Sequence, residues 1–239
     1  MTVILNGKAS NTKPEEVIAV NGKRTIEFPP VINGFVPTDI TINGYARPPV
    51  LPDCVLYLPF WHSKLSRQSP IYSMDKYAHV CTVTGALWTP KGRKFDGVDD
   101  KITCGTNSAL SFVSGTIILW IYHEPFVLSN HWLIDGRDGG AGVGYLFVTY
   151  QGVLAASAGT LYVDGVAGNA VSGAVWQQYA VSGIQITLAT LPFLIGARYI
   201  DLTDDNWMNG TIGEVVIYNY ALSAEEIKQN FDSTKWRYE

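Results

Sequence analysis

The chain has 239 residues, a formal net charge of −4, 47% hydrophobic residues and only 16% charged residues. Nucleic acid is excluded as an expected partner, because phosphate binding needs a basic surface and no cluster of lysine or arginine occurs. No apolar run approaches the ~20 residues of a membrane-spanning helix, and no secretory signal precedes the first elements, so we expect neither a membrane span nor export by such a signal.

Residues 1–50 contain four short apolar runs, each of which ends in Asn-Gly. The four runs occupy 3–7, 18–22, 31–34 and 40–44. Asn-Gly tolerates the positive φ angles of tight turns, so each run predicts a short strand that enters a hairpin turn. A segment of this length hardly buries a core of its own. We therefore expect a β-rich N-terminal arm or small assembly domain at 1–50 that packs on the main domain or on a neighbouring subunit. A proline-rich linker near 46–52 joins it to a second domain at 51–239.

From residue 54 onward, β-branched and aromatic runs alternate with turn signals. The predicted strands are 55–58, 86–88, 94–95, 101–104, 116–122, 145–150, 160–163, 176–181, 193–197 and 211–218. The run at 116–122 is apolar on both faces, which is typical of a central strand covered on both sides. Ser223 and Glu226 then form the capping box of a short helix. About ten strands and one helix indicate a two-sheet antiparallel sandwich.

The three cysteines are Cys54, Cys81 and Cys104. Their spacing matches no zinc site. They permit one disulfide and would leave one thiol over. Since no export signal is present, we favour ordinary unpaired cysteines in a protein made in a reducing cytoplasm.

The last strand is expected to place Glu214 on one face with Ile212, Val216 and Tyr218. A carboxylate on an apolar face needs a partner, because burial of an unpaired charge is costly. That partner is a metal, a backbone turn or a basic side chain.

An acidic turn, Asp96-Gly-Val-Asp-Asp100, offers hard oxygen ligands. Together with a carboxylate from a distant strand, such a turn suits Ca²⁺, which takes about six to eight oxygens. The predicted calcium ligands are Asp96, Asp99, Asp100 and Glu214. The alternative is a plain turn in which Asp96 and Asp99 accept backbone N–H groups and Gly97 supplies the positive φ.

A second candidate site is the loop 201–207, which combines acidic and amide groups with a tryptophan. Sugar recognition uses both, since a pyranose face stacks on an aromatic ring and its hydroxyls bond to planar polar side chains. The predicted glycan-binding residues are Asp201, Asp204, Asp205, Asn206 and Trp207. The alternative is a solvated loop whose Trp207 packs under the edge of the sheet.

Two further segments carry less specific signals. The glycine-rich run 135–144 lacks the Lys-Ser/Thr of a phosphate-binding loop, so we interpret it as a flexible loop between strands that could border a binding surface. An aromatic set at strand ends forms either a platform for partners or part of the core. Its members are Trp61, His62, Trp88, His131 and Trp132.

Seven pieces of the chain, taken in sequence order, resemble the concanavalin A-like jelly rolls, specifically the laminin G-like and pentraxin-like branch. The matching pieces are 56–60, 95–102, 115–122, 161–166, 176–181, 194–196 and 207–227, within a region from about 54 to 231. The resemblance implies an all-β, two-sheet antiparallel jelly-roll sandwich of the lectin/glucanase type with a lectin-like binding tendency. Relatives in this branch often carry calcium. The family often has Asp just before the strand glutamate, where this chain has Gly213.

Catalysis is not expected. Glucanases of this fold carry a Glu-x-Asp-x-x-Glu strand motif, whereas Glu214 is followed by Val-Val-Ile-Tyr. The chain also lacks G-x-S-x-G and H-E-x-x-H. A glycoside hydrolase is the least favoured alternative.

We therefore expect a non-catalytic, lectin-like structural or binding protein. The favoured interpretation is a virion component of a phage or virus, such as a capsid decoration protein, fibre or tail adhesin, made in the host cytoplasm. Its arm would contact other virion or self subunits in an oligomer or larger assembly, and its jelly roll would bind glycans. The alternative is a cellular carbohydrate-binding or adhesion module that is extracellular or at the cell surface.

Overall fold

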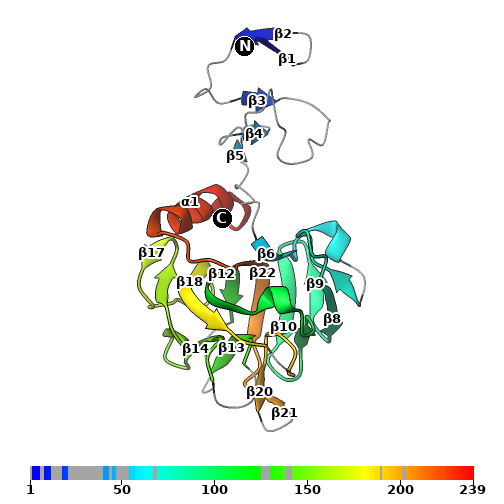
Figure 1. Ribbon diagram of the computed structural model, residues 1–239, viewed down its shortest axis with the longest axis vertical. Coiled ribbons are helices and arrows are strands. Elements are labelled where there is room, and N and C mark those ends of the chain that lie inside the picture. Colours follow the sequence, from blue (N-terminus) through cyan, green and yellow to red (C-terminus); the bar gives the residue numbers. More distant parts are fainter. Residues whose placement is uncertain are drawn as a thin grey trace. The chain divides into compact units, whose positions relative to one another are not determined.

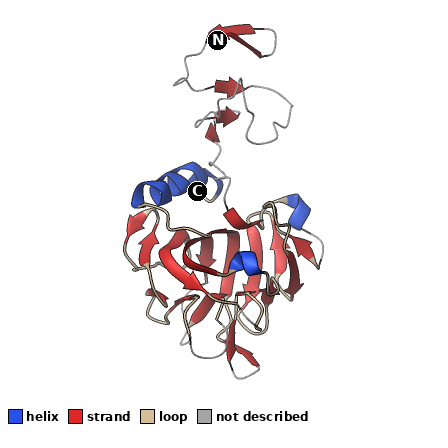
Figure 2. Cartoon of the chain, viewed as in Figure 1, coloured by secondary structure: helices blue, strands red, loops and turns tan. Residues whose placement is uncertain are grey.

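Two antiparallel sheets form the main body of the computed structural model of the protein (Figures 1 and 2). The structure describes residues 54–66, 69–124, 130–137, 142–188, 190–200 and 203–239, together with five short strands within residues 1–46. For those five strands, and for residues 200 and 203–205, it describes the backbone only. The chain divides into two compact units, Met1–Val50 and Leu51–Glu239.

The larger sheet has eight strands in the order β17-β16-β18-β12-β22-β10-β9, with β6 paired to β22. Their bounds are β6 Cys54–Pro59, β9 Leu87–Thr89, β10 Gly92–Asp96, β12 Phe112–His123, β16 Thr160–Val163, β17 Val166–Ala167, β18 Trp176–Ile186 and β22 Asn209–Tyr218. The long strands β12, β18 and β22 lie side by side at its centre (Figure 1).

The second sheet has seven strands in the order β15-β14-β13-β19-β11-β8-β7. Their bounds are β7 Ile71–Tyr72, β8 Val80–Thr84, β11 Lys101–Thr103, β13 His131–Asp135, β14 Tyr145–Val148, β15 Leu154–Ala156 and β19 Leu194–Ile195. Three short 3₁₀ turns are η1 Ser63–Leu65, η2 Ser108–Leu110 and η3 Lys235–Arg237, and β20 Arg198–Ile200 forms a small hairpin with β21 Thr203–Asp205.

The hydrophobic core lies between the two sheets. Alternate residues of the larger sheet, such as Ile117 and Leu119 of β12, join the same buried cluster as Leu146 and Val148 of β14. This alternation is the period-2 pattern of strands that each bury one face. The sequence prediction of an all-β, two-sheet antiparallel jelly-roll sandwich is confirmed.

The outer face of the eight-stranded sheet is covered by the C-terminal helix α1, Ala224–Thr234. Ile118 and Val216, on central strands, pack with Leu222 and Ile227 in a second buried cluster. The prediction that the run at 116–122 is covered on both sides is therefore confirmed. The predicted capping box is also present, since Ser223 Oγ accepts from the Glu226 N–H and the Glu226 carboxylate accepts from the Ser223 N–H.

Strand β22 contains a β-bulge at Gly213. Along β12, Trp120 lies opposite Glu214 while the next residue, Ile121, lies opposite Ile212, so Gly213 is the extra residue. A Cβ atom at Gly213 would collide with the ring of Tyr238, so only glycine fits at this position.

The bulge changes the side of the sheet to which the residues of β22 point. Ile212 packs in the core between the sheets, whereas Val216 and Tyr218 pack under the helix with Glu214 on their side of the sheet. The prediction that Glu214 shares a face with Val216 and Tyr218 is correct, and the inclusion of Ile212 was wrong. One extra residue reverses the side on which every earlier residue of the strand points.

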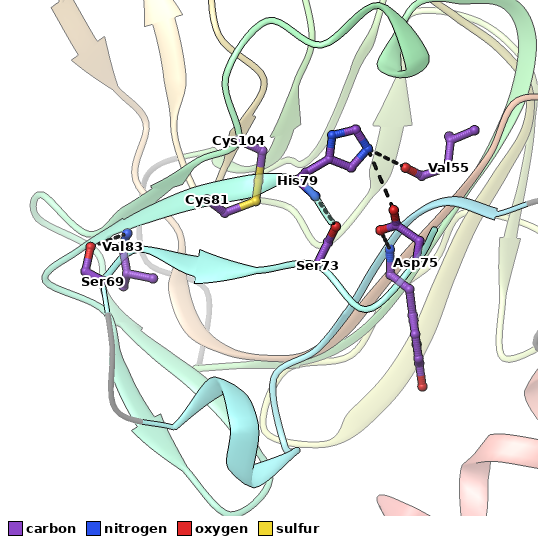
Figure 3. Close-up of a disulfide and its surroundings, with 9 residues drawn as sticks. Val55, Ser69, Ser73, Asp75, His79, Cys81, Val83 and Cys104 are labelled. Carbon is purple, nitrogen blue, oxygen red and sulfur yellow. Dashed lines mark hydrogen bonds and ion pairs between the residues drawn. A yellow bond between two sulfur atoms is a disulfide. The ribbon is translucent and has the colours of Figure 1, made fainter. Parts of the chain in front are cut away.

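Cys81 on β8 and Cys104, just after β11, form a disulfide (Figure 3). Cys54 is buried and takes no part in this bond. The favoured interpretation of three unpaired cysteines was therefore wrong. It was based on the expectation that the protein is made in a reducing cytoplasm, and this expectation carries no information about which strands become neighbours. β8 and β11 pair in the sheet, and this pairing brings the two sulfur atoms together.

Removal of the disulfide is expected to lower the free energy of unfolding by about 3 kcal/mol. The two cysteines are 23 residues apart, and the unfolded chain gains the entropy of a loop of that length when the bond is absent. Urea unfolding of a Cys81→Ala/Cys104→Ala double variant measures the loss. A reductant should destabilise the wild type and leave the double variant unchanged. Titration of three free thiols in the unreduced, unfolded wild type would contradict the pairing.

In the unit Met1–Val50 the structure describes five short strands. β1 Thr2–Leu5 pairs antiparallel with β2 Lys8–Asn11, and β4 Ile40–Ile42 pairs antiparallel with β5 Tyr45–Ala46. β3 Ile18–Val20 pairs with β4 in parallel, so this strand departs from the predicted hairpin. The Asn-Gly pairs, the run at 31–34 and most of the linker lie outside the described residues. The packing of this unit on other subunits stays a prediction.

No helix among the described residues is both long enough and apolar enough to cross a membrane.

Candidate functional site

The outer face of the seven-stranded sheet carries a group of aromatic side chains. On β14, Leu146 and Val148 point into the core, so Tyr145 and Phe147 point outward, and both are half-buried. Phe147 pairs with Trp132 on the neighbouring strand β13, and Tyr145 pairs with Asp135. Cross-strand pairing thus places three aromatic rings next to one another on this face.

The ring of Trp132 is the centre of this group. It stacks on Phe147 at 5.2 Å between centroids and lies tilted against Tyr145 at 5.1 Å. Two guanidinium groups lie over the indole, that of Arg137 at 4.6 Å and that of Arg198 at 5.3 Å from the centroid. We call these five residues the Trp132 cluster. Trp132 itself is only 5% exposed, so the half-buried rings of Tyr145 and Phe147 present the accessible aromatic surface.

A buried ion pair fixes one of the arginines. Arg137 donates to both oxygens of Asp135, from Nε to Oδ1 at 2.8 Å and from NH2 to Oδ2 at 2.7 Å. Asp135 also accepts from the backbone N–H groups of Arg137 and Tyr199. Because the planar guanidinium is held by two parallel hydrogen bonds, its position over the indole is set before any ligand arrives.

The predicted glycan loop lies beside the Trp132 cluster. The Asn206 carbonyl accepts from the backbone N–H of Trp132 at 3.0 Å, and Asn206 has a positive φ of 50°. Trp207 is half-buried, with Lys101 Nζ 5.8 Å from its ring centroid. Asp201 lies outside the described residues, and for Asp204 and Asp205 the structure describes only the backbone of β21. The hairpin β20–β21 also carries Arg198, which joins this loop to the cluster.

The two ends of the glycine-rich segment lie next to each other. Asp135 and Arg137 belong to its start, and Gly136 donates its N–H to the Gly144 carbonyl at 2.8 Å. Residues 138–141 lie outside the described residues. The part that is described therefore joins β13 to β14 next to the Trp132 cluster.

The acidic turn is held by its own hydrogen bonds. Asp96 Oδ1 accepts from the Val98 and Asp99 N–H groups, and Asp100 Oδ2 accepts from the Asp96 N–H at 2.8 Å. Burial raises the pKa of Asp100. Oxygens of the three aspartates lie within 4.8 Å of one another, and Gly97 has a positive φ of 81°. Asp96 and Gly97 take the parts that the plain turn assigns to them, whereas Asp100 accepts a backbone N–H in the place predicted for Asp99. Calcium binding by these three aspartates stays a prediction.

Glu214 is not brought to that turn. It is 2% exposed, and its Oε2 accepts from Arg237 NH1 at 3.1 Å, Trp61 Nε1 at 3.2 Å and Tyr57 Oη at 3.4 Å. Burial raises the pKa of Glu214, against the opposing effects of the Arg237 charge and the two neutral donors. Of the three partners that the sequence left open, the structure supplies a basic side chain.

The predicted aromatic platform is not a single surface. Trp61 lies under the guanidinium of Arg237 at 3.9 Å, and His131 pairs with His123 inside the protein at 3.3 Å between Nδ1 atoms. His62 caps η1, and Trp88 lies half-buried on β9. Of the five residues of the predicted platform, Trp132 belongs to the Trp132 cluster on the outer face of the seven-stranded sheet.

Sequence reasoning missed four residues of the cluster. The signal for two of them is present, because Tyr145 and Phe147 alternate with apolar residues along a predicted strand. Arg137 belongs to the glycine-rich run that was interpreted as a loop bordering a binding surface, but no sequence signal places its side chain or that of Arg198, 61 positions later, over the same indole.

Comparison with known proteins supports the fold. Residues 145–228 match a laminin G-type model of the concanavalin A-like lectin/glucanases superfamily, and none of the curated proteins matches the chain. A mutant of Trypanosoma rangeli sialidase displaying trans-sialidase activity is similar over 80% of this chain and 36% of its own, with a TM-score of 0.56 and 16% identity.

Two further solved structures are similar. Trypanosoma rangeli sialidase in complex with 2,3-difluoro-KDN covers 89% of this chain and 36% of its own, with a TM-score of 0.55 and 18% identity. Domain 4 of AbnA, a GH43 extracellular arabinanase from Geobacillus stearothermophilus, in complex with arabinotriose, covers 74% of this chain and 98% of its own at 15% identity and a TM-score of 0.48. This chain spans about a third of the sialidase chains, and identities this low show the fold alone.

The expectation of a virion component was wrong. The sialidase structures to which the chain is similar do not indicate a capsid, fibre or tail protein. That expectation was based on missing signals, low charge and the N-terminal Asn-Gly runs. None of these features is specific to particle assembly. A lectin-like domain is compatible with the fold.

Proposed function

We propose that the domain at 51–239 is a non-catalytic, lectin-like carbohydrate-binding module whose ligand contacts the Trp132 cluster. One observation carries the proposal: Tyr145 and Phe147 present half-buried rings on the outer face of the seven-stranded sheet, supported by Trp132 and flanked by two arginines. The outer face of the other sheet is occupied by helix α1.

The chemistry of the cluster suits a sugar. The apolar face of a pyranose ring packs on an aromatic ring, and guanidinium N–H groups donate to hydroxyl or carboxylate oxygens. The Asp135 ion pair holds Arg137 in place, which lowers the entropy lost on binding. The adjacent loop adds Trp207 at its end.

The proposal of a non-catalytic module is supported by the hydrogen bonding of Asp135, the carboxylate beside the Trp132 cluster. Glycoside hydrolysis uses two carboxyl groups about 5–10 Å apart, one of which must be able to gain and lose a proton. Both oxygens of Asp135 are held by Arg137, and Glu214 lies with Arg237 on the side of helix α1. We expect no hydrolysis of fluorogenic glycosides that are cleaved by this two-carboxylate mechanism.

The disulfide supports an extracellular or cell-surface location. Disulfides persist in oxidising compartments and are rare in the cytosol. Both members of the Cys81–Cys104 pair are buried, so the bond is part of the folded core. A carbohydrate-binding module that acts outside the cell is in an oxidising environment, where such a disulfide persists.

A glycan array followed by calorimetry tests the proposal. Tyr145→Ala and Phe147→Ala are each expected to weaken binding of the best array ligand by about tenfold or more, since aromatic side chains carry much of the affinity at such surfaces. Trp236→Ala is the control, because this exposed tryptophan follows helix α1. Equal affinity of all three variants and the wild type, or no array ligand at all, would contradict the proposal.

A further inference from the structure

The far edge of the same sheet carries another outward aromatic residue. On β7 and β8, Ile71 pairs with Cys81 and both are buried in the core, so the next pair, Tyr72 and Val80, points to the outer face. Tyr72 is 56% exposed and Val80 is 53% exposed. Tyr72 is thus placed like Tyr145, outward from the same sheet.

A cleft of about 450 Å³ lies at this edge. Its lining includes Lys64, Tyr72, Met74 and Asp75. The volume falls in the usual range for small-ligand sites, about 300–1,000 Å³. The ring of Tyr72 and the side chain of Met74 give it an apolar wall, and the exposed Lys64 supplies an ammonium donor. This combination can pack a sugar ring and bond to its oxygens.

The wall of the cleft is fixed by a buried carboxylate. Asp75 Oδ2 accepts from the Tyr57 N–H at 2.9 Å, and Oδ1 accepts from the Tyr77 N–H at 2.8 Å. His79 Nε2, 4.0 Å from Asp75 Oδ1, donates to the Val55 carbonyl at 2.7 Å (Figure 3). The segment around Tyr72 is therefore held in one conformation before a ligand binds, which favours affinity.

Hydroxyl groups lie between this cleft and the Trp132 cluster. Because Cys81 and Ile102 point into the core, the adjacent Thr82 and Thr103 point to the outer face. Thr84 also points outward, since Val83 before it packs against the core. Thr82 and Thr103 form a cross-strand pair. In the strand order, five steps separate β14 from β7. At a spacing of about 4.8 Å between strands, this separation is roughly 24 Å along the sheet.

We propose that the cleft at Tyr72 is a second sugar-contact site, and that the ligand is an extended oligosaccharide chain that reaches from the Trp132 cluster to Tyr72. This inference rests on the proposed function. A single terminal sugar cannot contact both places. A chain of several sugars can, because once one end is bound at one site the contact at the other site is intramolecular.

A length series of oligosaccharides tests the inference. The probes are cello-, manno-, chito- and arabino-oligosaccharides from disaccharide to hexasaccharide, measured by calorimetry. In the series that binds, affinity is expected to rise with length and then reach a plateau. Tyr72→Ala should lower the affinity for the hexasaccharide by about tenfold and leave the disaccharide unchanged, whereas Tyr145→Ala should weaken both. Tyr150→Ala is the matched control, since this tyrosine is 54% exposed and does not line the cleft.

The outcomes separate the two proposals. Binding that is independent of length, with no effect of Tyr72→Ala, overturns the second site and leaves the proposed function intact. Absence of binding by every series and by the array ligands overturns the proposed function and the inference with it. A larger loss for the hexasaccharide than for the disaccharide in Tyr72→Ala supports both.

Discussion

Acidification of the protein from pH 6.5 to about pH 3 is expected to reduce the free energy of unfolding by roughly 4 kcal/mol through His123 alone. Burial lowers the pKa of His123 from 6.5 to about 3. Between these values the unfolded chain binds a proton that the folded chain does not bind. The stability is therefore complete above pH 6.5 and is lost progressively as the pH falls toward 3.

The cause of the shift is the position of His123 inside the protein. Its side chain has no exposed surface, and its ring stacks on Tyr179 at 5.7 Å between centroids. The second group that faces it is His131, at 3.3 Å between Nδ1 atoms, and burial lowers the pKa of His131 as well. A charge on either imidazole would be desolvated and close to the other ring.

Urea unfolding at a series of pH values between 3 and 6.5 measures this effect. His123→Phe should show a shallower loss of stability with acid than the wild type, because phenylalanine cannot bind the proton. If the phenylalanine ring prevents folding of His123→Phe, His123→Asn replaces it, because asparagine cannot bind the proton either. His62→Gln is the comparison: burial lowers the pKa of His62 as well, but this side chain is half-buried at the start of η1, so its removal should change the acid dependence less than His123→Phe does. An identical acid dependence in His123→Asn and the wild type would rule out this account.

Replacement of Arg237 by methionine is expected to destabilise the protein by about 3–5 kcal/mol, because it leaves Glu214 as a buried carboxylate without its counter-charge. The side chains are 13% and 3% exposed, so water screens the pair only weakly. Trp61 and Tyr57 still donate to Glu214 in the variant, but both donors are neutral. Loss of the Arg237 charge should raise the pKa of Glu214 further, so the variant should lose additional stability as the pH rises.

A double-mutant cycle measures this pair. Glu214→Gln keeps the size of the side chain and removes the charge, so Arg237→Met/Glu214→Gln should be more stable than Arg237→Met alone. Lys228→Met is the matched control for the loss of a cation, because Lys228 forms an exposed pair with Asp232 on helix α1. Strictly additive effects of the two substitutions would show that Glu214 and Arg237 are not coupled.

Much of the fold could be predicted from residues whose signals are local. The run at 116–122 is apolar on both sides because it becomes β12, between the core and helix α1. Ser223 and Glu226 predict the start of that helix because the capping hydrogen bonds join residues three positions apart. Strand β13 was missed, since His131-Trp-Leu-Ile-Asp135 shows no alternation and contains a bulge.

The candidate site could be predicted only in fragments. Trp132, the glycine-rich segment and the loop before Trp207 are separate features of the sequence, and the structure brings Arg137 of that segment and Asn206 of that loop to Trp132. The calcium hypothesis joined Glu214 to the acidic turn, whereas the fold pairs Glu214 with Arg237. Proximity in these cases depends on which strands become neighbours, and a single sequence does not state this.

The sequence by itself determined the class of this protein: an all-β chain of short strands with one capped helix and the landmarks of a concanavalin A-like jelly roll. Those features depend on turn propensity, period-2 burial and capping, which act over a few residues. Only the tertiary structure decided the Cys81–Cys104 disulfide, the partner of Glu214, the reversal of faces at Gly213 and the assembly of the Trp132 cluster. Each of these depends on strand register and long-range packing, where a single bulge changes which side chains meet.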